Sequence, residues 1–308
     1  MDLKQLEYFV RVAELGSFTR ASIALDIAQP ALSRQVRLLE VELRQNLLIR
    51  NGRGAVPTEA GKLLLDHARG ILHQVAAARE DMRTRRGEAA GHVSIGLPPS
   101  LSRLMTVPLV QAFRSQLPNA QLTLTEGFSL QMNENLRLGH LDLAVLYNPA
   151  PSPDLEATIL RTEELALISN RPEVAPGVAP ALAASESISL REVLALPLIL
   201  PSRPNAFRLL MDGEAVTLGC PLHVAMEVDG LNAILSLVRE GLGHAVLPAY
   251  TLAGFSDPMR LSLRRIHSPQ LMSQLSLVRS SRRPVTETQR RACDMVRAVV
   301  EQAIQPLP

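Results

Sequence analysis

The sequence predicts an α/β protein with a small helical module at its N-terminal end, one long helix, and a larger domain of alternating strands and helices. Three patterns predict this. Apolar residues recur at helical spacing through residues 3–43. A heptad repeat of apolar residues follows between Leu64 and Met82. After His92, short apolar runs alternate with helical segments, as in a parallel or mixed sheet covered by helices.

The composition is that of an ordinary water-soluble chain. Its 308 residues are 46% hydrophobic and 20% charged, which is enough for two or more domains. The net charge of +2 indicates no particular partner, but residues 1–87 hold 14 Lys and Arg against 10 Asp and Glu, and the remainder holds 18 against 20. This mild basic excess is typical of nucleic-acid-binding modules. Two distant cysteines, a start without signal-peptide features and the lack of a membrane-length apolar run predict a cytoplasmic protein with no membrane partner.

The first 45 residues predict three helices joined by short turns. The first helix ends at Gly16, and Ser17 is placed to cap the second. A turn at residues 26–28 leads to the third helix, which has Pro30 in its first turn. Two helices joined by a tight turn form a helix-turn-helix. The segment "RNGRGAVPT" at residues 50–58 then predicts a basic hairpin, which suits a wing.

The third helix has two contrasting faces. Leu32, Val36, Leu39 and Leu43 form an apolar stripe, and the opposite side carries Pro30, Ser33, Arg34, Arg37 and Arg44. Such a face is often merely solvated. In a three-helix module with a wing, it favours the major groove of DNA, where Arg binds guanine and Gln binds adenine.

The segments "LKQLEYFVRVAELGSFTRAS", "AQPALSRQVRLLEVEL" and "RNGRGAVPTEAG" resemble the winged helix-turn-helix of LysR-type transcriptional regulators. The sequence departs from the family pattern at Ala28, where a capping Ser or Thr is common, and at Arg44 and Leu48. The resemblance implies a DNA-binding domain at residues 1–58. The residues expected at promoter DNA are Ser17, Thr19, Arg20, Gln29, Pro30, Ser33, Arg34, Arg37, Arg50 and Arg53.

The heptad pattern predicts a linker helix over residues 59–90. Leu64, Ala68, Ile71, Val75, Ala78 and Met82 alternate steps of four and three, so they form a seam that requires another helix. Packing of this seam onto its own domain is the alternative. The resemblance implies pairing with a second subunit, so that two reading heads meet an inverted repeat, and further assembly to a homotetramer.

Residues 91–308 resemble the effector-binding domain of the same family, which is similar to type II periplasmic binding proteins. The expected strands include "HVSIGL", "AQLTLTEG", "LDLAVLY", "LALIS" and "QLSLV", and helices are expected near residues 101–113, 132–141 and 286–304. The resemblance implies two lobes, residues 91–161 with 268–308 and residues 162–267, with crossings near Arg161 and Ser268. The segments "VSIGLPPSLSRLMTVPLV" and "LDLAVLYNP" resemble the branch that contains the nitrogen assimilation control regulator.

A ligand in such a domain lies beyond the carboxyl ends of the strands, at helix N-termini that favour an anion. In "LPPS", Ser100 is a candidate helix cap. We expect a small anion or carboxylate with an apolar part, although an ordinary cap or turn remains the alternative for each residue and a surface position the alternative for Arg203. The expected effector contacts are Pro99, Ser100, Leu101, Ser129, Tyr147, Ser202, Arg203, Val228 and His244.

The sequence shows no sign of catalysis. "GLGHAVLP" lacks the third glycine of a dinucleotide loop, the seven histidines show no metal-ligand spacing, and no G-x-S-x-G or P-loop occurs. We therefore expect a regulator that is not an enzyme, without cofactor or metal, whose partners are promoter DNA, a small-molecule effector and RNA polymerase. A cytoplasmic solute-binding protein and an effector-independent regulator are the alternatives.

Overall fold

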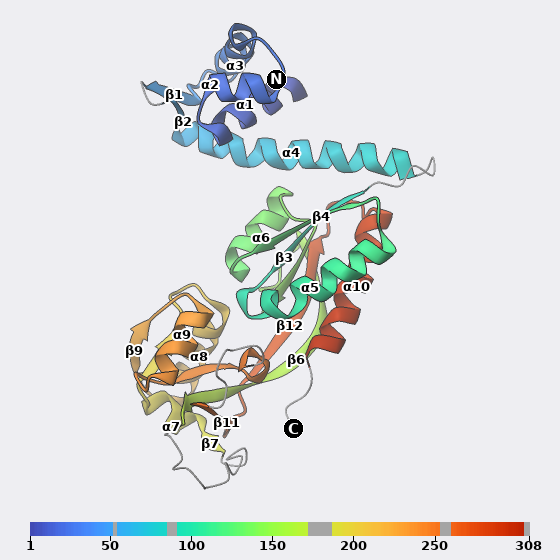
Figure 1. Ribbon diagram of the computed structural model, residues 1–308. Helices are drawn as coiled ribbons and strands as arrows, with labels where there is room; N and C mark the ends of the chain where they lie inside the picture. Colours follow the sequence, from blue (N-terminus) through green and yellow to red (C-terminus); the bar gives the residue numbers. More distant parts are fainter. Residues whose placement is uncertain (52–53, 85–90, 172–186, 253–259, 305–308) are drawn as a thin grey trace. The chain divides into compact units, whose positions relative to one another are not determined.

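The computed structural model describes residues 1–51, 54–84, 91–171, 187–252 and 260–304 (Figure 1). They form two compact units, one built on Met1–Gly91 and the other on His92–Leu136 and Leu141–Pro308. No helix in the described ranges is both long and apolar enough to cross a membrane.

The N-terminal unit contains the three expected helices, the wing and one long helix. These elements are α1 (Leu3–Leu15), α2 (Phe18–Ala24), α3 (Gln29–Leu43), β1 (Leu48–Asn51), β2 (Gly54–Pro57) and α4 (Glu59–Thr84). The Ser17 side chain accepts a hydrogen bond from the Arg20 backbone N–H, so the predicted cap of α2 is confirmed. Ala28 gives α3 no side-chain cap, as expected.

A small apolar core holds this unit together. The predicted stripe of α3 is confirmed, because Leu32, Val36 and Leu39 are fully buried and pack with Phe9 of α1. Antiparallel pairing of β1 with β2 confirms the predicted hairpin.

The heptad seam of α4 is only partly free for a second subunit. Leu64 and Ala68 pack against the core of their own unit, so the expectation that the whole seam serves a partner is wrong for its first half. Farther along α4, Ile71, Ala78 and Met82 are exposed. The short N-terminal unit needs the start of α4 to close its core. This explains why the first half of the seam packs in its own unit and residues of the second half are exposed.

The larger unit consists of alternating strands and helices. Its elements are β3 (His92–Leu97), α5 (Pro99–Gln116), β4 (Gln121–Glu126), α6 (Ser129–Leu138), β5 (Leu143–Tyr147), β6 (Leu155–Asn170), β7 (Ile188–Ser189), α7 (Leu190–Ala195), β8 (Leu198–Leu200), α8 (Ala206–Leu218), β9 (Val224–Glu227), α9 (Leu231–Arg239), β10 (Ala245–Pro248), η1 (Ala249–Leu252), β11 (Leu261–His267), β12 (Met272–Ser280) and α10 (Glu287–Ala303).

One long strand connects two groups of elements, or lobes. Residues 155–164 of β6 pair with β12 beside the parallel strands β5, β3 and β4, whereas residues 165–170 pair with β10 and β11. In the first lobe, α5 and α10 cover one face of the sheet and α6 covers the other (Figure 1). In the second lobe, α8 and α9 lie close to the short parallel pair β8 and β9 (Figure 1).

Several predicted boundaries differ from the structure. The strand expected at residues 165–169 is the second half of the 16-residue β6, whose first half carries too many charged residues to read as a strand. The sequence interpretation omitted α8, which contains Gly213, and β11, where adjacent Arg264 and Arg265 break the alternation. The helix expected at residues 132–141 spans Ser129–Leu138 instead, because Gly139 adopts a positive φ of 82° and ends it.

Candidate DNA interface and ligand cleft

The polar face of α3 borders an open hollow beside the wing. Gln29, Pro30, Ser33, Arg34 and Arg37, all expected at DNA, line it together. Its volume is about 650 Å³, and the remaining lining residues are Glu40, Asn46 and Leu48. The buried stripe fixes the rotation of α3, so the structure turns this polar face outward as a single surface.

The sequence interpretation missed the residue that joins α3 to the wing. The buried Glu40 carboxylate accepts hydrogen bonds from the backbone N–H groups of Leu47 at 2.9 Å and Leu48 at 3.2 Å. It also lies 3.6 Å from the Arg37 guanidinium. The sequence offered one signal for this contact, because Glu40 adjoins the apolar stripe of α3. A carboxylate at the edge of a buried face requires hydrogen-bond partners.

The other expected DNA contacts differ in their surroundings. Thr19 and Arg20 are exposed on α2, and the Arg20 guanidinium donates to the Leu15 carbonyl. The side chain of Arg50 and the whole of Arg53 lie outside the part of the chain that the structure describes.

A small cavity lies between the two lobes of the larger unit. Four expected effector contacts line it: Pro99, Ser100, Ser129 and Tyr147. Its volume is about 50 Å³, well below the roughly 300 Å³ at which drug-sized ligand pockets begin. The second lobe contributes Pro201, Asn205, Ala206, Phe207, Asp229, Leu231, Ile234 and Leu247.

Two aromatic rings meet across this cavity. Tyr147 ends β5 of the first lobe, and Phe207 lies in the first turn of α8. Their ring centroids are 4.6 Å apart and their planes are tilted by 50°. The Tyr147 hydroxyl lies 3.2 Å from the Ser100 hydroxyl, and both residues are buried.

Ser100 does not cap α5, so that prediction is wrong. The helix begins at Pro99, and Pro98 occupies the N-cap position without a side-chain hydrogen bond. Across the cavity, Gly230 likewise gives α9 no side-chain cap. Two helix N-termini without side-chain caps therefore begin at the cavity wall, where their N–H groups favour negative charge.

Five other expected contacts do not line the cavity: Leu101, Ser202, Arg203, Val228 and His244. Leu101 is fully buried in the core. Burial lowers the pKa of His244, and Arg264 lowers it further, while its Nδ1 atom lies 2.7 Å from the Ser169 hydroxyl. Among the described residues that line the cavity, none is Lys, Arg or His.

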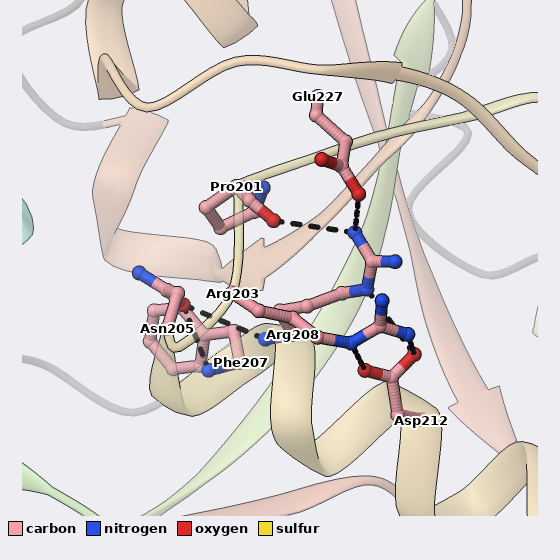
Figure 2. A network of polar contacts seen from close by, with 7 residues as sticks. All are labelled: Pro201, Arg203, Asn205, Phe207, Arg208, Asp212 and Glu227. Carbon is pink, nitrogen blue, oxygen red and sulfur yellow. Dashed lines mark hydrogen bonds and ion pairs between the residues drawn. The ribbon is translucent and has the colours of Figure 1, made fainter.

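An ion-pair network accounts for Arg203. Its Nε atom lies 2.7 Å from Asp212 Oδ2, so the guanidinium binds a carboxylate of its own lobe (Figure 2). Buried Arg208 joins the same carboxylate at 3.1 Å and reaches Glu227 at 2.6 Å. The side chain of Asn205 caps α8 by accepting from the Phe207 N–H at 2.9 Å. This network holds the loop that presents Phe207 to the cavity.

Comparison with known families decides the identity of both units. Residues 3–62 match the family described as "Bacterial regulatory helix-turn-helix protein, lysR family", and residues 86–301 match "LysR substrate binding domain". The chain belongs to the LysR family. LysR proteins are transcriptional regulators that bind DNA and effector ligands, and they are not enzymes.

Relatives and solved structures agree with this assignment. The nitrogen assimilation regulatory protein nac of Klebsiella aerogenes is 36% identical over 284 residues, covering 92% of this chain and 90% of that protein. Nac of Escherichia coli K12 is 34% identical over 278 residues, covering 90% and 88%. The resemblance to the nitrogen assimilation control branch of LysR regulators is thereby confirmed.

The LysR fold predicted from the sequence is also confirmed. A full-length OxyR variant from Pseudomonas aeruginosa superposes with a TM-score of 0.72 at 22% identity, covering 98% of this chain and 95% of that one. CbnR in complex with its target DNA gives a TM-score of 0.69 at 24% identity, covering 97% and 100%.

Proposed function

We propose that this LysR regulator acts in the cytoplasm and binds an inverted-repeat promoter site as a homodimer. In each half-site, α3 enters the major groove. The observation that supports this proposal is the open hollow lined by Gln29, Ser33 and Arg34, because amide, hydroxyl and guanidinium groups are those that read base edges.

The exposed half of α4 supports the dimer. Ile71, Ala78 and Met82 lie at heptad spacing and are exposed, so a second α4 would bury them. A two-fold axis between the subunits then matches the symmetry of an inverted repeat. Pairing of two dimers into a homotetramer and a contact with RNA polymerase extend the same proposal.

Footprinting on the DNA upstream of the protein's own gene tests this function. We expect two protected half-sites related by inversion, with an affinity that falls steeply as salt rises, because phosphate contacts release counterions. A protein that protects no upstream fragment at low salt would not have the proposed function.

For the effector, we propose a small anion or carboxylate with an apolar part. The N-termini of α5 and α9 would hold the negative group, Ser100 and Ser129 would donate hydrogen bonds, and the apolar wall would hold the remainder. Arg203 has no part in this proposal, because Asp212 occupies its guanidinium.

The effector site is tested by Ser100→Val, with Ser115→Val on the exposed side of α5 as its matched control. Isothermal titration with a series of small monocarboxylates, together with footprints, measures binding and response. Ser100→Val should bind promoter DNA normally and lose the response, whereas the control keeps both. An unchanged response in Ser100→Val would place the effector elsewhere.

The cavity's size favours one second candidate, an effector-independent regulator. With a volume of about 50 Å³ and the rings of Tyr147 and Phe207 in contact across it, the cleft leaves little space for a ligand. This candidate predicts that no metabolite changes the footprint and that Ser100→Val regulates like the wild type.

A further inference from the structure

A second pocket lies where β6 passes from one lobe to the other. We call it the hinge pocket. Arg161, Glu163 and Glu164 of β6 line it, with Tyr250 of η1, Arg265 of β11 and Ile304 after α10. Its volume is about 250 Å³, and it shares no lining residue with the cavity between the lobes.

Glu163 is the unusual residue of this pocket. Only 6% of it is exposed, and neither carboxylate oxygen has a hydrogen-bond partner among the described residues. Ser273, directly opposite on β12, is 1% exposed, and its hydroxyl likewise lacks a partner within the described ranges. Buried polar groups normally have partners, because leaving one unpaired costs about 1–3 kcal/mol. A group that lacks one in a pocket points to a ligand.

The charges around Glu163 define the class of ligand. Arg161 lies on the same strand, close enough to lower the pKa of Glu163, and its guanidinium donates to the Ile304 carbonyl at 2.7 Å. Arg265 and Glu164 also line the pocket, so its charged lining residues are two arginines and two glutamates. A metal ion would lie among two arginine side chains, and a simple anion would lie among two glutamate side chains. A molecule carrying both charges complements the pocket.

We propose that the hinge pocket binds a small zwitterion, an α-amino acid, with its carboxylate towards Arg161 and Arg265 and its ammonium group towards Glu163. The volume suits a ligand below drug size. The Glu163 carboxylate is shielded from solvent, so its side chain must turn to meet the ammonium group. Since it lacks a hydrogen-bond partner, it loses none by turning. This second site goes beyond the proposed promoter binding and effector response.

The proposed contact with Glu163 makes binding depend on pH. Burial raises the pKa of Glu163 to about 7, with Arg161 acting in the opposite direction. Glu164, Arg265 and Tyr250 are the other titratable or charged groups that line the pocket. Because the ammonium group pairs with the ionised carboxylate, affinity should be about tenfold weaker at pH 6 than at pH 8.

The experiment is isothermal titration of the full-length protein with each of the twenty amino acids, one at a time, at pH 6 and pH 8. Propionate and ethylamine serve as probes with one charge each. We expect at least one amino acid to bind with the stated pH dependence, and both single-charge probes to bind more weakly. Failure of all twenty to bind at pH 8 would overturn the proposal.

Variants assign the binding to the hinge pocket. Glu163→Gln keeps the side-chain shape and should lose at least tenfold in affinity together with the pH dependence. Its matched control, Glu156→Gln, lies on the same strand beside Arg279 and should bind like the wild type. Arg265→Gln should also weaken binding. Because Arg265 is exposed, this variant should fold and tests the site even if Glu163→Gln does not fold. Equal affinity in wild type, Glu163→Gln and Arg265→Gln would contradict the proposed site.

A final control separates the two sites. Ser129→Ala alters the cavity between the lobes and should leave amino-acid binding unchanged. Loss of binding in this variant would place the amino acid in that cavity and overturn the hinge proposal. Promoter binding by Glu163→Gln, measured in parallel, should remain normal, so failure of this inference is distinguishable from failure of the regulator function.

Discussion

Tyr147 and Phe207 close the cleft of the regulatory domain by contacting each other from opposite lobes, with ring centroids 4.6 Å apart. Tyr147 also holds Ser100 through its hydroxyl, so one side chain contributes both to the polar part of the cavity and to its closure. Any ligand entering between the lobes must displace or accommodate this ring pair.

The first prediction follows from that contact. Phe207→Leu keeps an apolar side chain but removes the ring. The variant should therefore bind aromatic carboxylates that are too large for the wild-type cavity. The free energy of unfolding should fall by only about 1 kcal/mol. Titration with benzoate and chemical denaturation measure both quantities.

Phe113→Leu is the control for this variant, because Phe113 is buried in α5 but does not line the cavity. It should lower the free energy of unfolding by a similar amount without changing the size of carboxylate that binds. If both variants bound the same larger carboxylates, the contact between Tyr147 and Phe207 would not be what limits the size of the ligand.

The second prediction concerns base recognition by α3. Arg34→Ala should weaken binding to the promoter site by about 1–3 kcal/mol, because it removes a bidentate base contact, and it should relax the sequence preference. Footprint titrations on the promoter site and on a scrambled fragment measure the two effects. Arg11→Ala, on the exposed side of α1, should change neither. Unchanged affinity and preference in Arg34→Ala would remove Arg34 from the interface.

The third prediction concerns the dimer. Ile71→Asp should raise the dissociation constant of the dimer by roughly 30-fold or more, because a carboxylate buried without a partner costs at least about 2 kcal/mol. Analytical ultracentrifugation measures this. Ala76→Asp, exposed on another face of α4, places the same charge outside the seam and should leave the dimer intact. A stable dimer of Ile71→Asp would show that α4 does not pair as proposed.

The fourth prediction concerns the pH dependence of stability. Because burial raises the pKa of Glu163 from 4.5 to about 7, the folded state holds this proton more tightly than the unfolded state. The stabilisation is present below pH 4.5 and declines as pH rises to about 7, by an amount on the order of 3 kcal/mol. Glu163→Gln cannot ionise, so its denaturation curves should lack this component. Identical pH profiles for both proteins would show that Glu163 titrates normally.

Local sequence determined the three helices of the DNA-binding unit and the outward face of α3, but not the contact of Glu40 with the wing. Ser17 caps α2, Pro30 lies in the first turn of α3, and the period of Leu32, Val36 and Leu39 fixes which side of α3 faces the core. These features act within a few residues of the chain, so spacing and residue type suffice to predict them. The same stripe also determines that Arg34 lies on the outer face.

The sequence placed Ser100, Ser129 and Tyr147 at the cavity between the lobes, but only the tertiary structure decided which residues meet them and which line the hinge pocket. Phe207 reaches Tyr147 because α8 of one lobe approaches β5 of the other, and Arg203 turns away because Asp212 offers its guanidinium a closer partner. Glu163 faces Ser273 because β6 pairs with β12, a strand far along the chain. Such contacts depend on strand register and on the packing of the lobes. Both bring together segments that are far apart in the chain, and the local sequence of one segment does not specify its partner.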